Sequence, residues 1–313
     1  MSVSASVRRH AARPWAGLSS SAVLNWFRNP DGKARFLWVM VWGYIVWSIA
    51  PLLIAIRISF NRGKSLVEPD GWSLIWWWSN PVDSAWHRPD LHSALLQSVK
   101  LACLTMLISV PLGVAFAIAL DRWRGPLPSS ANFLMTMSWV TPELIIGVAL
   151  FMVFSHLLRF IPFGTPAQLL GLITFEMTYP VIIVRARLLS LGRETEEAAM
   201  DLGASPMQAL RRAVLPQLYP AIVASLMIVF VDSVDDFIIA AWMAGPSSSE
   251  TVAMRIYNDA RGSVTPALDA LGCMLMVTTL STLVVGGLVY RYLAKRAHGA
   301  EEGALSDIVA SQA

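Results

Sequence analysis

Three aspartates, Asp232, Asp235 and Asp236, occur within one long apolar run of this chain. Their spacing of three and four residues predicts that all three carboxylates share one face of a helix. A charge inside a membrane costs several kcal/mol, so acids in such a run indicate a functional site. Because acids this close together repel one another unless a cation is near, the cluster predicts a path for a positively charged solute.

Two glutamates, Glu143 and Glu176, lie in other apolar runs. We expect Glu143 to line the same cation path as the aspartates. Other arrangements would also satisfy these acids: ion pairs with Arg57 or Arg185, ion pairs with a partner subunit, or protonation. The sequence leaves these alternatives open.

The chain offers no constellation for covalent chemistry. Its best fragment of a phosphate-binding loop is Gly63-Lys64-Ser65, but position 58 is Ile where the pattern requires Gly. The two cysteines lie in apolar runs, where we expect small core residues. We therefore predict no enzyme activity, no catalytic residue and no bound metal. The histidines are dispersed along the chain, at His10, His87, His92, His156 and His298.

Composition places the chain in a membrane. Hydrophobic residues make up 55% and charged residues 14% of its 313 residues, where soluble domains carry about 25% charged residues. Mean hydropathy is +0.55, and there are 13 tryptophans, a residue enriched at membrane interfaces. The net charge of +3 is too small and scattered to suggest nucleic-acid binding. These values favour an all-α polytopic membrane protein.

Six apolar runs are long enough to cross a bilayer as helices of about 20 residues. They divide the chain into an N-terminal tail (1–35), a transmembrane domain (36–293) and a C-terminal tail (294–313). Between the first two runs, the Trp-rich stretch 61–93 is expected to anchor at the lipid interface. The predicted spans are Phe36–Phe60, Ala94–Leu120, Phe133–Leu158, Ala167–Leu189, Leu218–Met243 and Ala267–Tyr292.

The distribution of Lys and Arg predicts the orientation, because cytoplasmic loops carry the excess of these residues. Most of them fall in the two tails and in the loops after spans 2 and 4. We therefore expect a plasma or inner membrane protein with both termini cytoplasmic. The residues on the predicted outer side are Arg62, Lys64, Arg88, Arg159, Arg255 and Arg261.

The loop between spans 4 and 5, residues 190–216, has strong helix punctuation. Glu197 belongs to an acidic helix start, where the helix dipole favours negative charge. Gly203 suits a helix end with positive φ, and Ser205-Pro206 suits the next helix start. Two short helices with a turn between them, and no chemistry of their own, indicate a docking element.

This loop resembles the EAA loop of ABC-importer permeases, in which a coupling helix sits in a groove of a cytoplasmic ATPase. The resemblance implies a six-helix, MetI-like fold that binds no cofactor, since ATP and Mg²⁺ belong to the ATPase. Ala213 stands where the family usually has Ile. The residues expected to couple the chain to the ATPase are Glu197, Ala198, Ala199, Gly203, Ser205, Pro206, Leu215 and Pro216.

The segment 230–240 narrows the resemblance to the spermidine/putrescine (PotC-type) permeases. That family implies a heterodimer with a second homologous permease, two ATPase copies and an extracytoplasmic solute-binding protein. A permease for iron, thiamine or another organic cation would share the layout. Two alternatives come from other classes. An ion-coupled secondary carrier would explain the buried acids but leaves the EAA loop unexplained, and in a structural or assembly subunit the intramembrane acids would be a needless cost.

Overall fold

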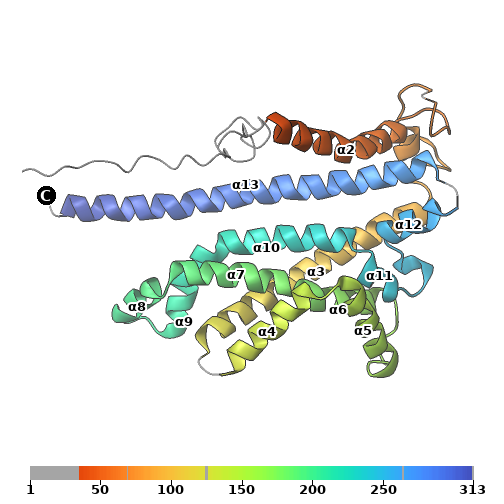
Figure 1. The fold of residues 1–313 in the computed structure, drawn as a ribbon. Coiled ribbons are helices and arrows are strands. Elements are labelled where there is room, and N and C mark those ends of the chain that lie inside the picture. Colours follow the sequence, from red (N-terminus) through yellow and green to blue (C-terminus); the bar gives the residue numbers. More distant parts are fainter. Residues whose placement is uncertain (1–34, 69, 124–125, 263, 312–313) are drawn as a thin grey trace, which may run out of the picture. The chain divides into compact units, whose positions relative to one another are not determined.

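The computed structural model describes residues 35–68, 70–123, 126–262 and 264–311, and Figure 1 shows their arrangement. Apart from one bridge between Asn61 and Trp72, these residues contain no β structure, so the all-α prediction is confirmed. The main helices are α2 (Arg35–Ser59), α3 (Pro89–Arg122), α4 (Pro126–Val140), α5 (Glu143–His156), α6 (Thr165–Glu176), α7 (Thr178–Leu191), α8 (Glu194–Asp201), α9 (Pro206–Ala209), α10 (Leu215–Asp235), α11 (Ile238–Trp242), α12 (Val252–Ala260) and α13 (Pro266–Ser311). Three short irregular helices, η1 (Ile75–Ser79), η2 (Leu210–Val214) and η3 (Ser247–Ser249), join them.

The chain forms two units, one ending at Ile54 and the other beginning at Ala55. The described part of the first unit is the greater part of α2, an apolar helix whose side chains are largely exposed, as Trp47 is at 79%. The other described helices belong to the second unit. The predicted N-terminal tail lies outside the described residues except for Arg35. The backbone of the predicted C-terminal tail continues α13 as far as Ser311.

Length and hydropathy identify six candidate spans when a bent pair of helices is taken as one. The bent pair, Phe133–Val140 and Glu143–His156, turns by 109°. The other five are Leu37–Ser59, Pro89–Arg122, Thr165–Leu191, Pro206–Asp235 and Pro266–Leu293.

Two predicted spans are interrupted. The third, Phe133–Leu158, breaks before Pro142, which lacks an N–H and disfavours helical geometry in the preceding residue. The fifth was expected to reach Met243. Instead α10 ends at Asp235, because Asp236 has an extended ψ of 122°, and α11 follows.

Helix α3 is the centre of the second unit and packs against α6, α7 and α10 (Figure 1). It continues through Pro111 without interruption. Two residues further, Gly113 lies so close to α7 that a Cβ atom would come within 2.5 Å of the Pro180 ring. The apolar side chains of α3, α7 and α10 form one core cluster here, which includes Val114, Val184 and Leu218.

The Trp-rich stretch differs in part from the prediction of a lipid-anchoring belt. Trp76 and Trp77, in η1, are only 4% and 9% exposed and belong to the protein core, where Trp77 stacks on Phe60. Trp72 and Trp78 are exposed, at 73% and 51%. Only the exposed tryptophans therefore suit an interfacial role.

Candidate functional site

The loop 190–216 has the two-helix form predicted from its punctuation. Helix α8 ends at Asp201, and Gly203 then takes a φ of +87°, a conformation that favours glycine. Ser205 caps α9 through a capping box: its hydroxyl accepts from the Gln208 N–H, and the Gln208 side chain accepts from the Ser205 N–H. Pro206 is the first residue of α9. The turn between the two helices is therefore defined by local interactions alone.

The exposed surface of this loop carries apolar side chains. Leu202 is 90% exposed and Met207 63% exposed, on either side of the Gly203 turn. Nothing lies within 4 Å of the position that a Cβ atom would take at Gly203. Glu197 and Ala198 are also exposed, while Ala199 is half-buried. Leu215 and Pro216 form the first turn of α10. A small apolar projection of this kind is typical of a docking surface.

The acids on and after α10 occupy different environments. Asp232 and Asp235 are exposed on the helix itself. Asp236 lies beyond the helix end, and its Oδ1 accepts a 2.8 Å hydrogen bond from the Ala240 N–H of α11. Asp232 and Asp236 nevertheless interact electrostatically, although α10 ends at Asp235.

A buried amide fixes the segment that carries Asp236. Gln168, which is fully buried on α6, donates to the carbonyl oxygens of Ala240 and Ser249 at 3.0 and 2.9 Å, and accepts from Gln97 of α3 at 3.0 Å. Ala240 therefore connects this amide to the Asp236 carboxylate. Gln168 and Gln97 could not be predicted from the sequence, because two glutamines 71 residues apart give no local signal.

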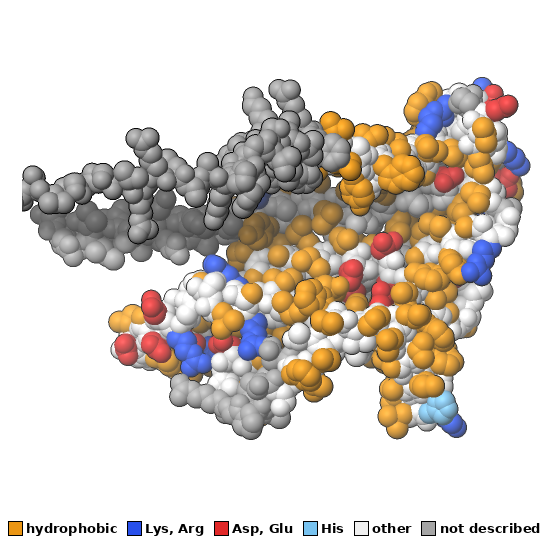
Figure 2. Space-filling model, viewed as in Figure 1, with side chains coloured by type: hydrophobic (Ala, Val, Ile, Leu, Met, Phe, Trp, Pro, Cys, Tyr) orange, Lys and Arg blue, Asp and Glu red, His pale blue; other side chains and the backbone are white. Residues whose placement is uncertain are grey.

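Four carboxylates converge at this point of the fold. Glu176 ends α6 and interacts electrostatically with Asp232 and Asp236, while Asp236 interacts with Glu143, the first residue of α5. Glu143 and Asp236 each lie at a helix end next to a break in a span. Figure 2 shows acidic side chains grouped within an otherwise largely hydrophobic face.

Glu176 is the most buried of these acids. It is 1% exposed, and its Oε2 has no hydrogen-bond partner among the described residues. Tyr179, three residues further on α7, interacts with Asp232 and Glu143. Its position in an apolar run did not by itself predict that Glu176 lies with the other acids. Tyr179 was not predicted either, and its i+3 spacing from Glu176 was the available signal.

Ion pairing with Arg57 does not neutralise the acids. The Arg57 guanidinium lies over the Trp72 ring, 4.5 Å from its centroid. Within the part of the chain that the structure describes, none of the four carboxylates forms an ion pair with Lys or Arg. The same residues contain no group of three or more acids, histidines or cysteines arranged to hold a metal ion.

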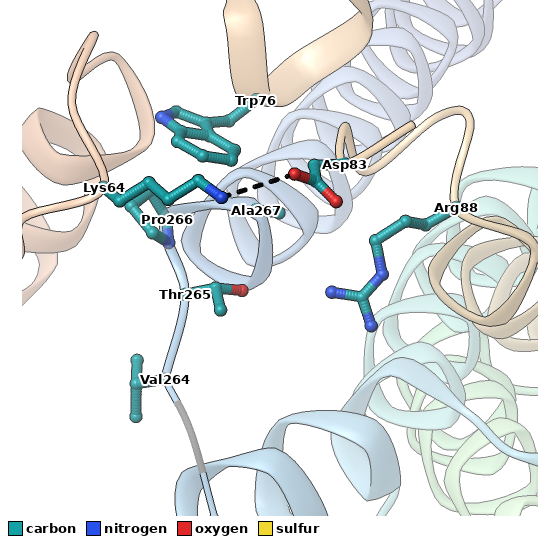
Figure 3. Close-up of a pocket in the computed structure, with 8 residues that line it drawn as sticks. All are labelled: Lys64, Trp76, Asp83, Arg88, Val264, Thr265, Pro266 and Ala267. Carbon is teal, nitrogen blue, oxygen red and sulfur yellow. Dashed lines mark ion pairs between the residues drawn. The ribbon is translucent and has the colours of Figure 1, made fainter. Parts of the chain in front are cut away.

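A second polar region lies at the other end of α3 from the docking loop. Figure 3 shows a pocket of about 140 Å³ between Trp76, Arg88 and Thr265, in which Lys64 points toward Asp83 at 3.6 Å. The remaining lining residues are Asp83, Val264, Pro266 and Ala267.

Next to this pocket, Arg255 of α12 pairs with Asp90 of α3 at 2.7 Å and also with Glu250 and Asp259. Burial lowers the pKa of Arg255, but the carboxylates, led by Asp259 and Asp90, outweigh burial and hold this pKa above its ordinary value. This network ties α12 to the start of α3.

Six candidate spans, two of them interrupted, and a two-helix loop between the fourth and fifth indicate the class of the chain: a membrane permease. Residues 109–299 match the family described as "Binding-protein-dependent transport system inner membrane component", and the chain belongs to that family. The predictions of an inner membrane transport subunit and of no enzyme activity are thereby confirmed. The alternatives of a secondary carrier and an assembly subunit are not supported.

Individual relatives agree with this assignment. The putrescine transport system permease protein PotI of Escherichia coli (strain K12) is 32% identical over 257 residues, which cover 79% of this chain and 86% of the relative. The spermidine/putrescine transport system permease protein PotC of the same strain is 29% identical over 244 residues, covering 77% and 88%. The resemblance to spermidine/putrescine permeases is therefore confirmed.

Solved structures confirm the fold. A chain of a bacterial ABC transporter involved in the import of the acidic polysaccharide alginate superposes with a TM-score of 0.65 at 15% identity, covering 82% of this chain and 95% of that chain. A chain of the MetNI methionine ABC transporter in an inward-facing conformation gives a TM-score of 0.57 at 17% identity, covering 65% and 96%. The MetI-like architecture predicted from the EAA loop is therefore correct.

Proposed function

We propose that this chain is a permease subunit of an ATP-driven polyamine importer and forms one side of the path for spermidine or putrescine. The relatives named as putrescine and spermidine/putrescine permeases support this substrate. The observation that carries the proposal is the convergence of Glu143, Glu176, Asp232 and Asp236 in an apolar surrounding.

Polyamines combine ammonium groups with methylene chains. The carboxylates suit the ammonium groups, and the apolar surrounding suits the methylene chains. Carboxylates replace the water that an ammonium loses on entering the path, and they repel one another less once a cation lies between them. The ring of Tyr179 offers a cation–π contact beside Asp232. We expect Asp232 and Asp236 to face the path and Asp235 to be structural, pairing with a neighbouring helix.

Transport requires coupling to a separate ATPase. In this proposal the docking surface enters a groove of the ATPase. This surface consists of Glu197, Ala198, Ala199 and Gly203 with the cap residues Ser205 and Pro206. The first turn of α10, Leu215 and Pro216, then passes ATPase closure to the span that carries Asp232. ATP and Mg²⁺ bind to the ATPase, and this chain holds no cofactor.

The complete importer in this proposal contains a second homologous permease subunit as a heterodimer partner, two ATPase copies and an extracytoplasmic solute-binding protein. The docking loop and both termini are cytoplasmic, as the Lys and Arg distribution indicates. The pocket around Lys64 and Arg88 then opens on the outer side, at the opposite end of α3.

Uptake by the reconstituted complex tests the proposal. The double variant Asp232→Asn with Asp236→Asn keeps side-chain size but removes charge. Spermidine and putrescine uptake should fall about tenfold or more, since losing hydrogen bonds to charged groups costs about 1.5–3 kcal/mol each. The control Glu68→Gln removes an exposed acid outside the spans and should transport normally. Normal spermidine uptake by the double variant would mean that these acids are structural and would remove the physical support for the substrate.

A further inference from the structure

The end of α3 meets the start of α8 through two side chains. Arg122, the last residue of α3, pairs with Glu196 in the first turn of α8, with 2.7 Å between the guanidinium nitrogen and the carboxylate oxygen. Next to this pair, Arg193 donates to the backbone carbonyl of Asp121 at 3.1 Å. This carbonyl belongs to the last turn of α3, where helix carbonyls lack partners within the helix. The docking loop is therefore joined to α3 independently of the chain that links α8 to α7.

The geometry makes this joint stronger than an ordinary surface ion pair. The Arg122 and Glu196 side chains are only 30% and 19% exposed, so water screens them incompletely. A cation suits the C-terminal end of α3, and an anion suits the N-terminal end of α8, because each opposes the partial charge of its own helix end. The partial charges of the two helix ends therefore add to the attraction between Arg122 and Glu196.

Three glutamates begin α8, and the structure separates their roles. Glu196 turns inward to Arg122, whereas Glu194 and Glu197 are exposed. Glu197 remains available to a docked partner. A movement imposed on the outer side of α8 is thereby transferred through its inner side to α3.

Helix α3 is suited to carry such a movement through the membrane. It has 34 residues without interruption, a length of roughly 50 Å at 1.5 Å per residue. Near its middle it contacts α7 closely at Gly113 and Pro180, and at its far end Asp90 pairs with Arg255 of α12. A displacement at Arg122 therefore reaches the opposite end of the unit through one rigid element.

We propose that Arg122 and Glu196 are positioning residues that transmit the movement of the docking loop to α3 during the transport cycle. This role rests on the proposed function, because it requires a docked ATPase. It differs from the docking role of Glu197 and Gly203: Arg122 and Glu196 act after the ATPase has bound.

The test uses the complete complex in proteoliposomes with the binding protein and spermidine. Four variants are compared: Glu196→Gln, Arg122→Gln, the exchanged pair Arg122→Glu with Glu196→Arg, and Glu194→Gln as the exposed control on the same helical turn. In both single variants, the ATPase should still co-purify and keep its basal rate. The substrate-stimulated rate and uptake should fall about fivefold, the lower end of usual coupling between sites. The exchanged pair should recover at least half of the wild-type stimulation, and Glu194→Gln should behave as wild type.

Several results would overturn this role. Full stimulation in Glu196→Gln would show that the pair transmits nothing. Loss of membrane insertion in both single variants, restored by the exchange, would show that the pair serves folding instead. Failure of the exchange to restore stimulation would show that the two residues do not act as a pair. A wild-type chain that binds no ATPase would refute the proposed function itself, and that outcome is distinguished by co-purification alone.

Discussion

The close crossing of α3 and α7 gives a prediction whose size follows from the structure. A methyl group at Gly113 would lie 2.5 Å and 2.9 Å from Pro180 ring carbons and 3.1 Å from the Met177 carbonyl oxygen. A proline ring and a backbone carbonyl cannot rotate away, so α3 and α7 must separate by about 1 Å to reach ordinary contact at 3.5–4.0 Å. We expect Gly113→Ala to destabilise the fold.

The net effect combines two opposing contributions. Overpacking costs about 1–3 kcal/mol, while replacing a helical glycine by alanine returns about 0.8–1.0 kcal/mol. The expected loss is therefore roughly 1 kcal/mol for Gly113→Ala, and larger for Gly113→Val because its branched side chain must enter the same space. A loss of this size lowers the Tm by about 2–4 °C.

Thermal unfolding of the purified chain in detergent, followed by tryptophan fluorescence, measures this loss. Gly287→Ala is the matched control, because nothing lies within 4 Å of the added Cβ in the same kind of helix. This control should be as stable as wild type or slightly more stable. If Gly113→Ala and Gly287→Ala had equal Tm values, α3 and α7 would not cross as closely as described.

Three further predictions concern the docking loop and the orientation. In Gly203→Asp, an aspartate must adopt the unfavourable positive φ of this position, and its side chain adds bulk at the docking turn. Transport and stimulated ATPase activity should therefore fall together while the chain still inserts into the membrane. Stimulated ATPase activity at the wild-type level would contradict the docking role. Ser205→Ala removes the cap of α9 and should lower the stability of this helix by about 1 kcal/mol, which limited proteolysis would detect as faster cleavage within the loop 190–216. The control variant Ser190→Ala should be cleaved at the wild-type rate. Cysteine labelling from outside intact cells should reach Leu66 but not Met207, and outside labelling at Met207 would reverse the proposed topology.

Features decided by neighbouring residues could be predicted from the sequence. The Gly203 turn, the Ser205 cap and the Pro206 helix start each depend on contacts within four residues, and all three are present. Pro142, which lacks the N–H that a helix interior needs, coincides with the 109° bend. The size of that bend depends on packing against other helices, so the residue type alone gave only its position.

Features that join distant segments could not be predicted. Arg122 and Glu196 are 74 residues apart, and charge alone did not distinguish Glu196 from the exposed Glu197 beside it. Trp76 and Trp77 have the composition of an interfacial belt, yet the core contacts of η1 bury them. The end of α10 at Asp235 was also missed, because the apolar pattern continues into α11 without any Gly or Pro.

The positions of the acids at helix breaks have a consequence for how a cation is released. Glu143 follows the 109° bend between α4 and α5, and Asp236 follows the end of α10. Bending at either of these points changes the distances between carboxylates, and doubling a charge separation from about 4 to 8 Å halves its Coulomb energy. In the proposed importer, cation affinity therefore depends on the angles between the helices, so the rearrangement that opens the path to one side also weakens the binding of the cation.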